Sequence, residues 1–158
     1  LIISLHLYMK APVWALIDRV SVFGSSTSYH RFAIVDQFIK RLDEWWVLGV
    51  KSTEQWHESL QMWDTTNQFV LIGVEGGLLS LFLLILLIIY CFGGAGKAIK
   101  FFENNKRSLL IWAIGSVLFA NIVAFMGGSY WGQIYFLWIL NLALISISSD
   151  ISARNQLS

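Results

Sequence analysis

The chain has 158 residues, of which 56% are hydrophobic and only 13% are charged. Average soluble domains carry about a quarter charged residues, and a core this small could not hide so much apolar surface, so the composition excludes an ordinary soluble domain and favours segments that face lipid. The formal net charge of +1 provides no basic field that would attract nucleic acid.

The first elements along the chain precede any complete span. Residues 1–9 are apolar but shorter than the roughly 20 residues that a helix needs to cross a bilayer, so we interpret them as the end of a truncated transmembrane helix. Residues 10–68 are polar and nearly neutral, and we predict an outer loop that contains amphipathic helices. Within this loop, residues 11–22 are typical of a helix at the membrane interface.

A second loop helix is predicted for residues 28–46, after a turn at residues 24–28. Thr27 or Ser28 is its expected N-cap. Helical spacing places several apolar side chains on one face, which we expect to meet membrane or protein: Phe32, Val35, Phe38, Ile39 and Leu42. The loop also carries tryptophans typical of the aromatic belt at a membrane interface, namely Trp45, Trp46, Trp56 and Trp63.

Three later segments are apolar and long enough to span a membrane. The first covers residues 69–92, and the other two form a helical hairpin over residues 108–148 with a glycine-rich turn at residues 127–129. Asn121 and Asn141 lie inside the hairpin, where hydrogen bonds between helices are their expected role. The sequence therefore predicts an all-α, polytopic helical membrane protein with at least three transmembrane helices and a helical outer (periplasmic) loop.

The basic residues predict the orientation of these spans. Residues 93–107 contain one acidic residue, Glu103, and four basic residues: Lys97, Lys100, Lys106 and Arg107. The positive-inside rule places this loop in the cytoplasm. Residues 10–68 then lie outside, and residues 149–158 form a cytoplasmic tail.

Arg31, next to His30, is the first candidate site residue in the outer loop. An arginine at a membrane-facing cleft can hold a diphosphate through paired hydrogen bonds, a geometry that lysine cannot reproduce. The alternative is a solvated helix face on which Arg31 merely precedes Asp36. The sequence contains no cysteine and histidine cluster with metal spacing, no phosphate-binding glycine loop and no nucleophile elbow, so we expect no metal and no cofactor.

A second group of polar residues precedes the first complete span: Asp64, Thr65, Thr66, Asn67 and Gln68. Thr65 and Gln68 have the spacing of a capping box, which would close the open end of the helix. The other three stay candidates for binding, because a helix N-terminus at the membrane surface also attracts anions.

Glu75 is the third candidate and lies about two turns into the predicted span. A carboxyl group there is costly and by default faces a partner or a wet cavity. The nearby glycines Gly73, Gly76 and Gly77 would let another helix approach closely. Glu75 is therefore either a structural carboxyl group at a packed interface or a residue that orders the outer cleft.

Taken together, these motifs resemble the C-terminal part of the O-antigen ligase and O-antigen polymerase superfamily. Four stretches carry the resemblance through their order and spacing: residues 24–31, 44–49, 63–69 and 73–77. Members are polytopic glycosyltransferases of the bacterial inner membrane. The resemblance implies transfer of a glycan from undecaprenyl diphosphate to a hydroxyl group of a glycan or lipid-glycan acceptor, during synthesis of lipopolysaccharide or another cell-surface polysaccharide.

The resemblance also implies residue roles. Arg31 stands where the family has an arginine thought to engage the diphosphate, and Asn67 and Glu75 keep the family spacing. Thr66 stands where ligases commonly have a histidine, so we consider His30 and Asp64 as substitutes. We thus expect catalytic roles for Arg31, Asp64 and His30, and substrate-binding roles for Arg19, Asn67 and Glu75.

Two other functions fit a membrane chain of this kind. A transporter or channel subunit would carry polar residues through several spans toward a midplane site, but here the spans offer only Glu75, Asn121 and Asn141. A non-catalytic scaffold for envelope assembly would have an inert outer loop, in which Arg31 could be replaced without consequence.

Overall fold

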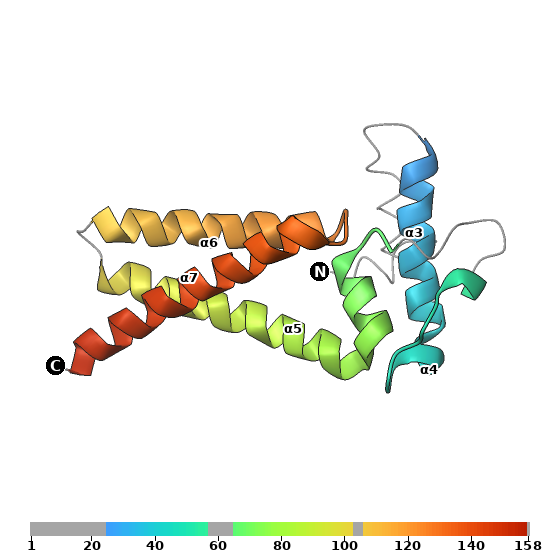
Figure 1. The fold of residues 1–158 in the computed structure, drawn as a ribbon, viewed down its shortest axis with the longest axis horizontal. Coiled ribbons are helices and arrows are strands. Elements are labelled where there is room, and N and C mark those ends of the chain that lie inside the picture. Colours follow the sequence, from blue (N-terminus) through green and yellow to red (C-terminus); the bar gives the residue numbers. More distant parts are fainter. Residues whose placement is uncertain (1–24, 57–64, 103–105, 158) are drawn as a thin grey trace, which may run out of the picture. The chain divides into compact units, whose positions relative to one another are not determined.

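The fold comes from a computed structural model that describes residues 25–56, 65–102 and 106–157. The described residues form helices and connecting segments, with no strand among them, in the order α3 (Ser25–Lys40), α4 (Leu42–Trp45), the short 3-10 helix η2 (Glu54–Trp56), α5 (Gln68–Phe101), α6 (Lys106–Phe125) and α7 (Gly132–Leu157) (Figure 1). The chain divides into two compact units, Leu1–Leu79 and Ser80–Ser158.

Three helices are long and apolar enough to cross a membrane: Gln68–Phe101, Lys106–Phe125 and Gly132–Arg154. Their large apolar side chains mostly point outward, as in Phe82, Leu109 and Phe136, which are 55%, 71% and 66% exposed. Such apolar surface needs lipid around it, because soluble proteins rarely expose contiguous apolar patches of this kind. The predicted class is confirmed: this is an all-α, multi-pass membrane protein.

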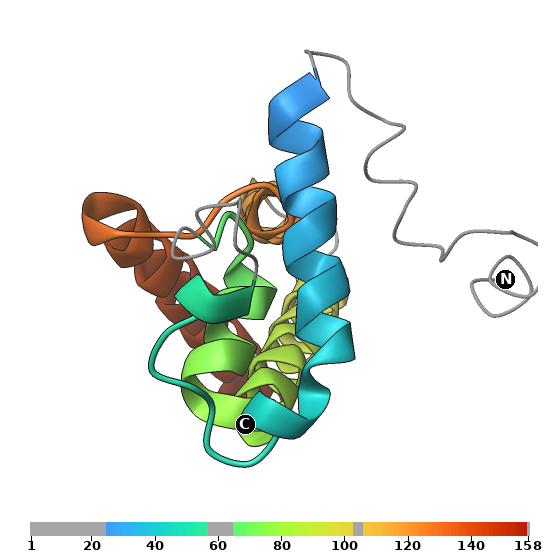
Figure 2. The ribbon, with the colours of Figure 1, turned by 90° about the vertical axis from the view of Figure 1, so that its right-hand side faces the viewer.

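Helix α3 begins earlier than the sequence suggested, at Ser25 (Figure 2). The predicted turn at residues 24–28 and the N-cap at Thr27 or Ser28 are therefore wrong. The N–H groups of a first helical turn have no partner within the helix, so serine and threonine lose little by adopting helical geometry there. The predicted 28–46 helix is also interrupted at Arg41, which separates α3 from α4.

The core of the first unit is built around Trp45. Its side chain is 1% exposed, stacks on the Phe38 ring with centroids 4.0 Å apart, and donates an indole hydrogen bond to the Phe38 carbonyl oxygen at 2.8 Å. Trp56 is also buried, and its indole N–H donates to the Glu44 carboxylate at 3.1 Å. The predicted aromatic belt is therefore wrong for these two tryptophans, whose polar N–H groups find partners inside the protein. Trp46 is exposed, and Trp63 lies outside the described residues.

The apolar face predicted for residues 28–46 is only partly buried. Ile39 and Leu42 are exposed, whereas the smaller Ala33 and the neighbouring Ile34 are among the most buried residues. Spacing of the large side chains alone did not identify this contact, because α3 packs on a face that includes a small residue.

Helix α5 is broken at Gly77, which has φ 73° and ψ −176°. This conformation is essentially restricted to glycine, and it separates a short first half that begins at Gln68 from a second half that runs from Leu78 to Phe101. The second half alone exceeds the roughly 20 residues needed to cross a bilayer. The chain also stays helical past the predicted end of the span at residue 92, so much of the predicted loop 93–107 is helix.

The segment from Trp46 to Val50 fills the break. The Leu78 N–H donates to the Trp46 carbonyl oxygen at 2.9 Å, and the Val50 N–H donates to the Val74 carbonyl oxygen at 2.7 Å. These bonds satisfy backbone groups that a broken helix leaves without partners. The sequence correctly indicated a close approach at the glycines around Glu75. At Gly73 the approaching group is the Phe38 ring of helix α3, whereas at Gly77 it is the irregular backbone of residues 46–50.

Both backbones come very close at this point. A Cβ atom on Gly77 would overlap the Val47 carbonyl oxygen, and one on Gly49, which has φ 76°, would lie 2.7 Å from the Glu75 carbonyl carbon. A Cβ on Gly73 would lie 2.7 Å from the Phe38 ring. Glycine at 49 and 77 is what allows the segment to dock, and glycine at 73 leaves room for the Phe38 ring.

In the second unit, α6 and α7 form the predicted hairpin. The Asn141 side-chain N–H donates to the Ile114 carbonyl oxygen at 3.2 Å, which confirms a hydrogen bond between helices. The Tyr130 hydroxyl in the turn donates to Asn121 Oδ1 at 2.7 Å, and the Tyr130 ring packs edge-on against Phe125. Burial raises the pKa of the Tyr130 hydroxyl above its usual value.

Candidate functional site

The four described residues with an expected catalytic or substrate-binding role all belong to the first unit. His30 and Arg31 lie on α3, Asn67 precedes α5, and Glu75 lies on the first half of α5. Arg19 and Asp64 lie outside the described residues, and so does the predicted interfacial helix 11–22. The roles expected for these two residues stay predictions.

Arg31 is half-buried, and its Nε atom is fully buried without a hydrogen-bond partner among the described residues. The carboxylate that follows it, Asp36, forms an ion pair with Lys40 at 2.7 Å. Leaving a buried charged donor unpaired costs about 1–3 kcal/mol or more, so native proteins normally provide it with a partner. An anionic oxygen from a ligand would satisfy this donor.

Arg41, directly after the last residue of α3, differs in its surroundings. Its Nε donates to the Gln37 side-chain oxygen at 3.2 Å, and its Nη1 forms an ion pair with Glu44 at 2.8 Å. Of these two arginines, Arg41 is therefore held by protein groups, whereas Arg31 keeps an unused donor.

Asn67 is the N-cap of α5. Its side-chain oxygen accepts hydrogen bonds from the backbone N–H groups of Phe69 at 3.0 Å and Val70 at 3.2 Å. The predicted capping box of Thr65 and Gln68 is wrong, because the helix begins at Gln68 itself. Asparagine and threonine are both good N-caps, so the spacing alone did not identify which residue closes the helix.

Neither Thr65 nor Thr66 is the N-cap of α5, and their side chains lie in different environments. The Thr66 hydroxyl oxygen is buried and has no hydrogen-bond partner among the described residues. Thr65 is 6% exposed and lines a cavity next to α5.

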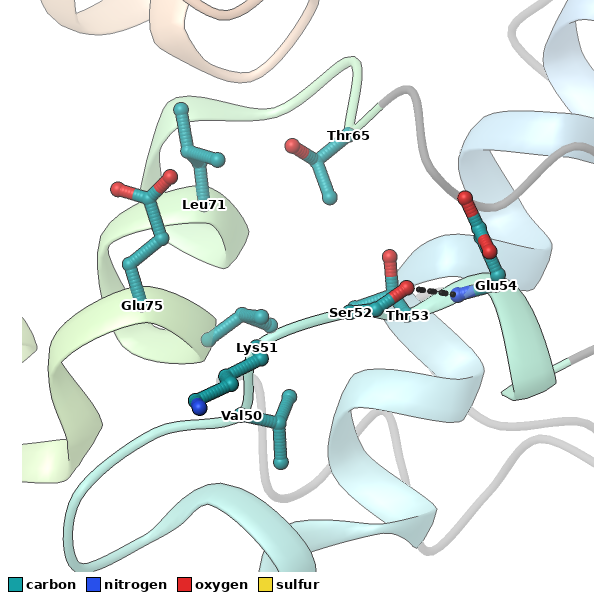
Figure 3. A pocket seen from close by; sticks show the side chains of 9 residues that line it. Val50, Lys51, Ser52, Thr53, Glu54, Thr65, Leu71 and Glu75 are labelled. Atoms are coloured by element: carbon teal, nitrogen blue, oxygen red, sulfur yellow. Dashed lines mark hydrogen bonds between the residues drawn. The ribbon is translucent and has the colours of Figure 1, made fainter.

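This cavity has a volume of about 230 Å³ and lies between residues 50–54, which we call the strip, and the start of α5 (Figure 3). We call it the strip cavity. Figure 3 shows Glu75 and Leu71 on the helical side, with Ser52, Thr53 and Glu54 opposite them. The full lining is Val50, Lys51, Ser52, Thr53, Glu54, Thr65, Leu71, Val74 and Glu75.

Glu75 is exposed and faces this cavity, which agrees with the expectation that a carboxyl group at this position faces a wet space. Arg31 and His30 are not among the lining residues. Lys51 is also part of the lining, although no sequence pattern singled it out. Its position follows from the docking of residues 46–50 into the helix break, a contact that has no signal in the local sequence.

A second cavity of about 380 Å³ adjoins the strip cavity and shares three lining residues with it: Val50, Lys51 and Ser52. Its other lining residues are Arg41, Glu44, Gln55 and Trp56. Within the part of the chain that the structure describes, no group of three or more His, Cys, Asp or Glu side chains is placed to hold a metal ion.

Comparison with protein-family models, with curated proteins and with solved structures found no match to this chain.

Proposed function

We propose that the chain is part of a membrane glycosyltransferase of the O-antigen ligase or polymerase type. It would transfer a glycan from undecaprenyl diphosphate to a hydroxyl group of a glycan or lipid-glycan acceptor, at the outer face of the bacterial inner membrane. The observation that carries the proposal is the buried, unpaired Nε of Arg31. A guanidinium group with a free donor is suited to an oxyanion, and a diphosphate offers several.

The reaction needs little beyond charge stabilisation and removal of one proton. The acceptor oxygen forms a bond to the anomeric carbon of the donor glycan, while the bond from that carbon to the diphosphate oxygen breaks. The electron pair leaves with the diphosphate, whose growing negative charge Arg31 meets. The proton of the acceptor hydroxyl passes to a base, for which Asp64 is the candidate from the sequence and His30 the alternative.

The break in α5 is the feature that favours the rival transporter function, because many transporters bind their substrate at discontinuous helices. Such breaks lie near the membrane midplane. Here the second half of α5 is long enough to span on its own, so the break at Gly77 lies toward the end of the span. Asn121 and Asn141 are both engaged in hydrogen bonds within the hairpin. The geometry therefore favours chemistry at a membrane surface.

The test is transfer of a radiolabelled lipid-linked glycan by membranes that contain the full-length protein. Arg31→Lys and Arg31→Ala should each lower the rate strongly, since removing one donor to a developing charge costs about 2.7–4 kcal/mol in the barrier, or roughly 100- to 1,000-fold. The matched control is Arg154→Lys, because Arg154 forms only an exposed ion pair with Asp150. Rates are normalised to the amount of protein in the membrane.

Equal rates for wild type, Arg31→Lys and Arg31→Ala would remove Arg31 from the mechanism and favour the scaffold. Movement of the lipid-linked glycan between membrane leaflets, with no new glycosidic bond, would favour the transporter.

A further inference from the structure

We propose that the strip cavity binds the acceptor glycan, and that it takes an uncharged, hydroxyl-rich sugar residue. The identification of the sugar as the acceptor rests on the proposed function, but the binding of a sugar in this cavity can be tested by itself. Glu75 and Thr65 are the residues that would hold the sugar from the α5 side, with Ser52 and Glu54 opposite them (Figure 3).

The lining has the chemistry of a carbohydrate site. Carboxylate oxygens accept hydrogen bonds from sugar hydroxyl groups, and serine and threonine hydroxyls both donate and accept them. Among the described residues, the Glu75 carboxylate and the Thr65 hydroxyl form no hydrogen bond or ion pair with another side chain. Both groups are therefore available to a ligand, although Thr65 itself is buried.

The charge of the lining argues against the diphosphate as its ligand. The lining contains two acidic residues, Glu54 and Glu75, and one basic residue, Lys51, so its formal net charge is negative. A diphosphate would meet repulsion there, whereas neutral hydroxyl groups would not. The unpaired donor of Arg31 lies outside this lining, so donor diphosphate and acceptor sugar would be held by different residues.

The cavity is fixed in shape by backbone contacts. The Val50 N–H bond to the Val74 carbonyl oxygen, at 2.7 Å, ties the strip to α5 one residue ahead of Glu75. On the strip, the Glu54 N–H donates to the Ser52 hydroxyl oxygen at 3.2 Å and holds the chain in a tight bend. A site with preset geometry loses less entropy when a ligand binds.

The size fits one sugar residue at a time. A volume of about 230 Å³ holds several water molecules of roughly 30 Å³ each, but falls short of the roughly 300–1,000 Å³ of pockets that enclose drug-sized ligands. The adjoining 380 Å³ cavity, which shares Lys51 and Ser52, offers room for the next residue of an oligosaccharide. An acceptor glycan could therefore occupy both cavities along residues 50–55.

The experiment measures sugar binding to the full-length protein in lipid nanodiscs by saturation-transfer difference NMR, without any donor. The ligand is the oligosaccharide fraction released by mild acid from the glycolipids of the host cell. Glu75→Gln and Thr65→Val should each weaken binding at least about tenfold, as expected for a lost hydrogen bond to a charged or buried group. The controls are Asp43→Asn, an exposed carboxylate on α4 outside the lining, and Arg154→Lys, which changes only an exposed ion pair.

Binding that is lost in the two cavity variants and kept in both controls supports the site. If wild type binds in this way but transfers no glycan, the site stands and the proposed function fails. No binding by wild type, unchanged binding in Glu75→Gln and Thr65→Val, or displacement of the sugar by inorganic diphosphate would each overturn the inference. Elution of each variant as a single species in size-exclusion chromatography shows that a loss of binding is not a loss of folding.

Discussion

Arg31 lies within α3 and Arg41 directly follows it, and the two side chains differ in what surrounds them. Arg41 is held by Gln37 and Glu44, whereas the Nε of Arg31 has no described partner. The resemblance to a glycan-transferase family singled out Arg31 from the sequence. It could not distinguish the two side chains by their partners, because hydrogen-bond partners at helical spacing depend on rotamers and on which face of the helix is packed.

Asn67 carries two possible roles, N-cap of α5 and predicted substrate contact, and substitutions separate them. Asn67→Ala removes the oxygen that accepts from Phe69 and Val70, so it should lower the free energy of unfolding by about 1 kcal/mol. Asn67→Asp keeps an acceptor oxygen and should preserve stability. Unfolding of the purified protein by a denaturing detergent measures both changes.

The same pair of variants tests the predicted substrate contact. If Asn67 serves only as a cap, Asn67→Asp should transfer glycan as fast as wild type. A slow but stable Asn67→Asp protein would show that the side-chain amide N–H groups reach the substrate, and would give Asn67 a role that its cap geometry does not require.

At the scale of the element, the long apolar helices were predictable and the break in one of them was not. The 3.6-residue pattern and segment length identify where a helix lies. The conformation of Gly77 is set by the docking of Val47, thirty residues earlier in the sequence, so no local pattern around Gly77 distinguishes a kinked helix from a straight one. The three glycines near Glu75 indicated only that something approaches closely.

Substitution of Gly77 tests the break. Gly77→Ala places a Cβ against the Val47 carbonyl oxygen and forces a side chain into a backbone conformation that costs about 1–3 kcal/mol, so the free energy of unfolding should fall by about 2 kcal/mol or more. The matched control is Gly96→Ala in the same helix, where nothing lies within 4 Å of the added carbon. Because alanine favours helix over glycine, this control should be neutral or slightly stabilising.

Thermal unfolding of both variants in the same detergent gives the comparison. If Gly77→Ala were as stable as Gly96→Ala, α5 could run straight through residue 77, and the strip cavity would lose its anchored wall.

At the scale of the whole molecule, the predicted orientation rests on the basic residues between the first span and the hairpin. Helix α5 carries Lys97 and Lys100 in its last turns, and α6 begins at Lys106. We expect this end to be cytoplasmic. In a Cys91→Ala background, a membrane-impermeant thiol reagent added to intact cells should label Ser26→Cys and leave Asn105→Cys unlabelled.

Labelling of Asn105→Cys alone would invert this topology and place Arg31 and the strip cavity on the cytoplasmic face. Undecaprenyl-linked glycans awaiting transfer would then be on the opposite side from the site, and the proposed function would fail with the orientation.

The residues of the candidate site that lie close together in the sequence were predictable, and those brought together from distant segments were not. Asn67 and Glu75 lie within one short stretch, and the local pattern was enough to single them out. Lys51 and Thr65 come together with Glu75 only because residues 46–50 dock into the helix break. Contacts between backbone atoms across that distance leave no side-chain pattern, so the cavity could not be predicted from residue types.

The same docking has a consequence for how relatives of this protein could diverge. Its hydrogen bonds join backbone atoms of Trp46, Val50, Val74 and Leu78, and backbone atoms are present whatever the side chain. Gly49 and Gly77 are required by residue type, because both have positive φ and the facing backbone leaves no room for a Cβ. Distant homologues could therefore replace nearly every side chain here and keep these backbone hydrogen bonds. Their sequences would share only two glycines, with a helix N-cap residue before the second.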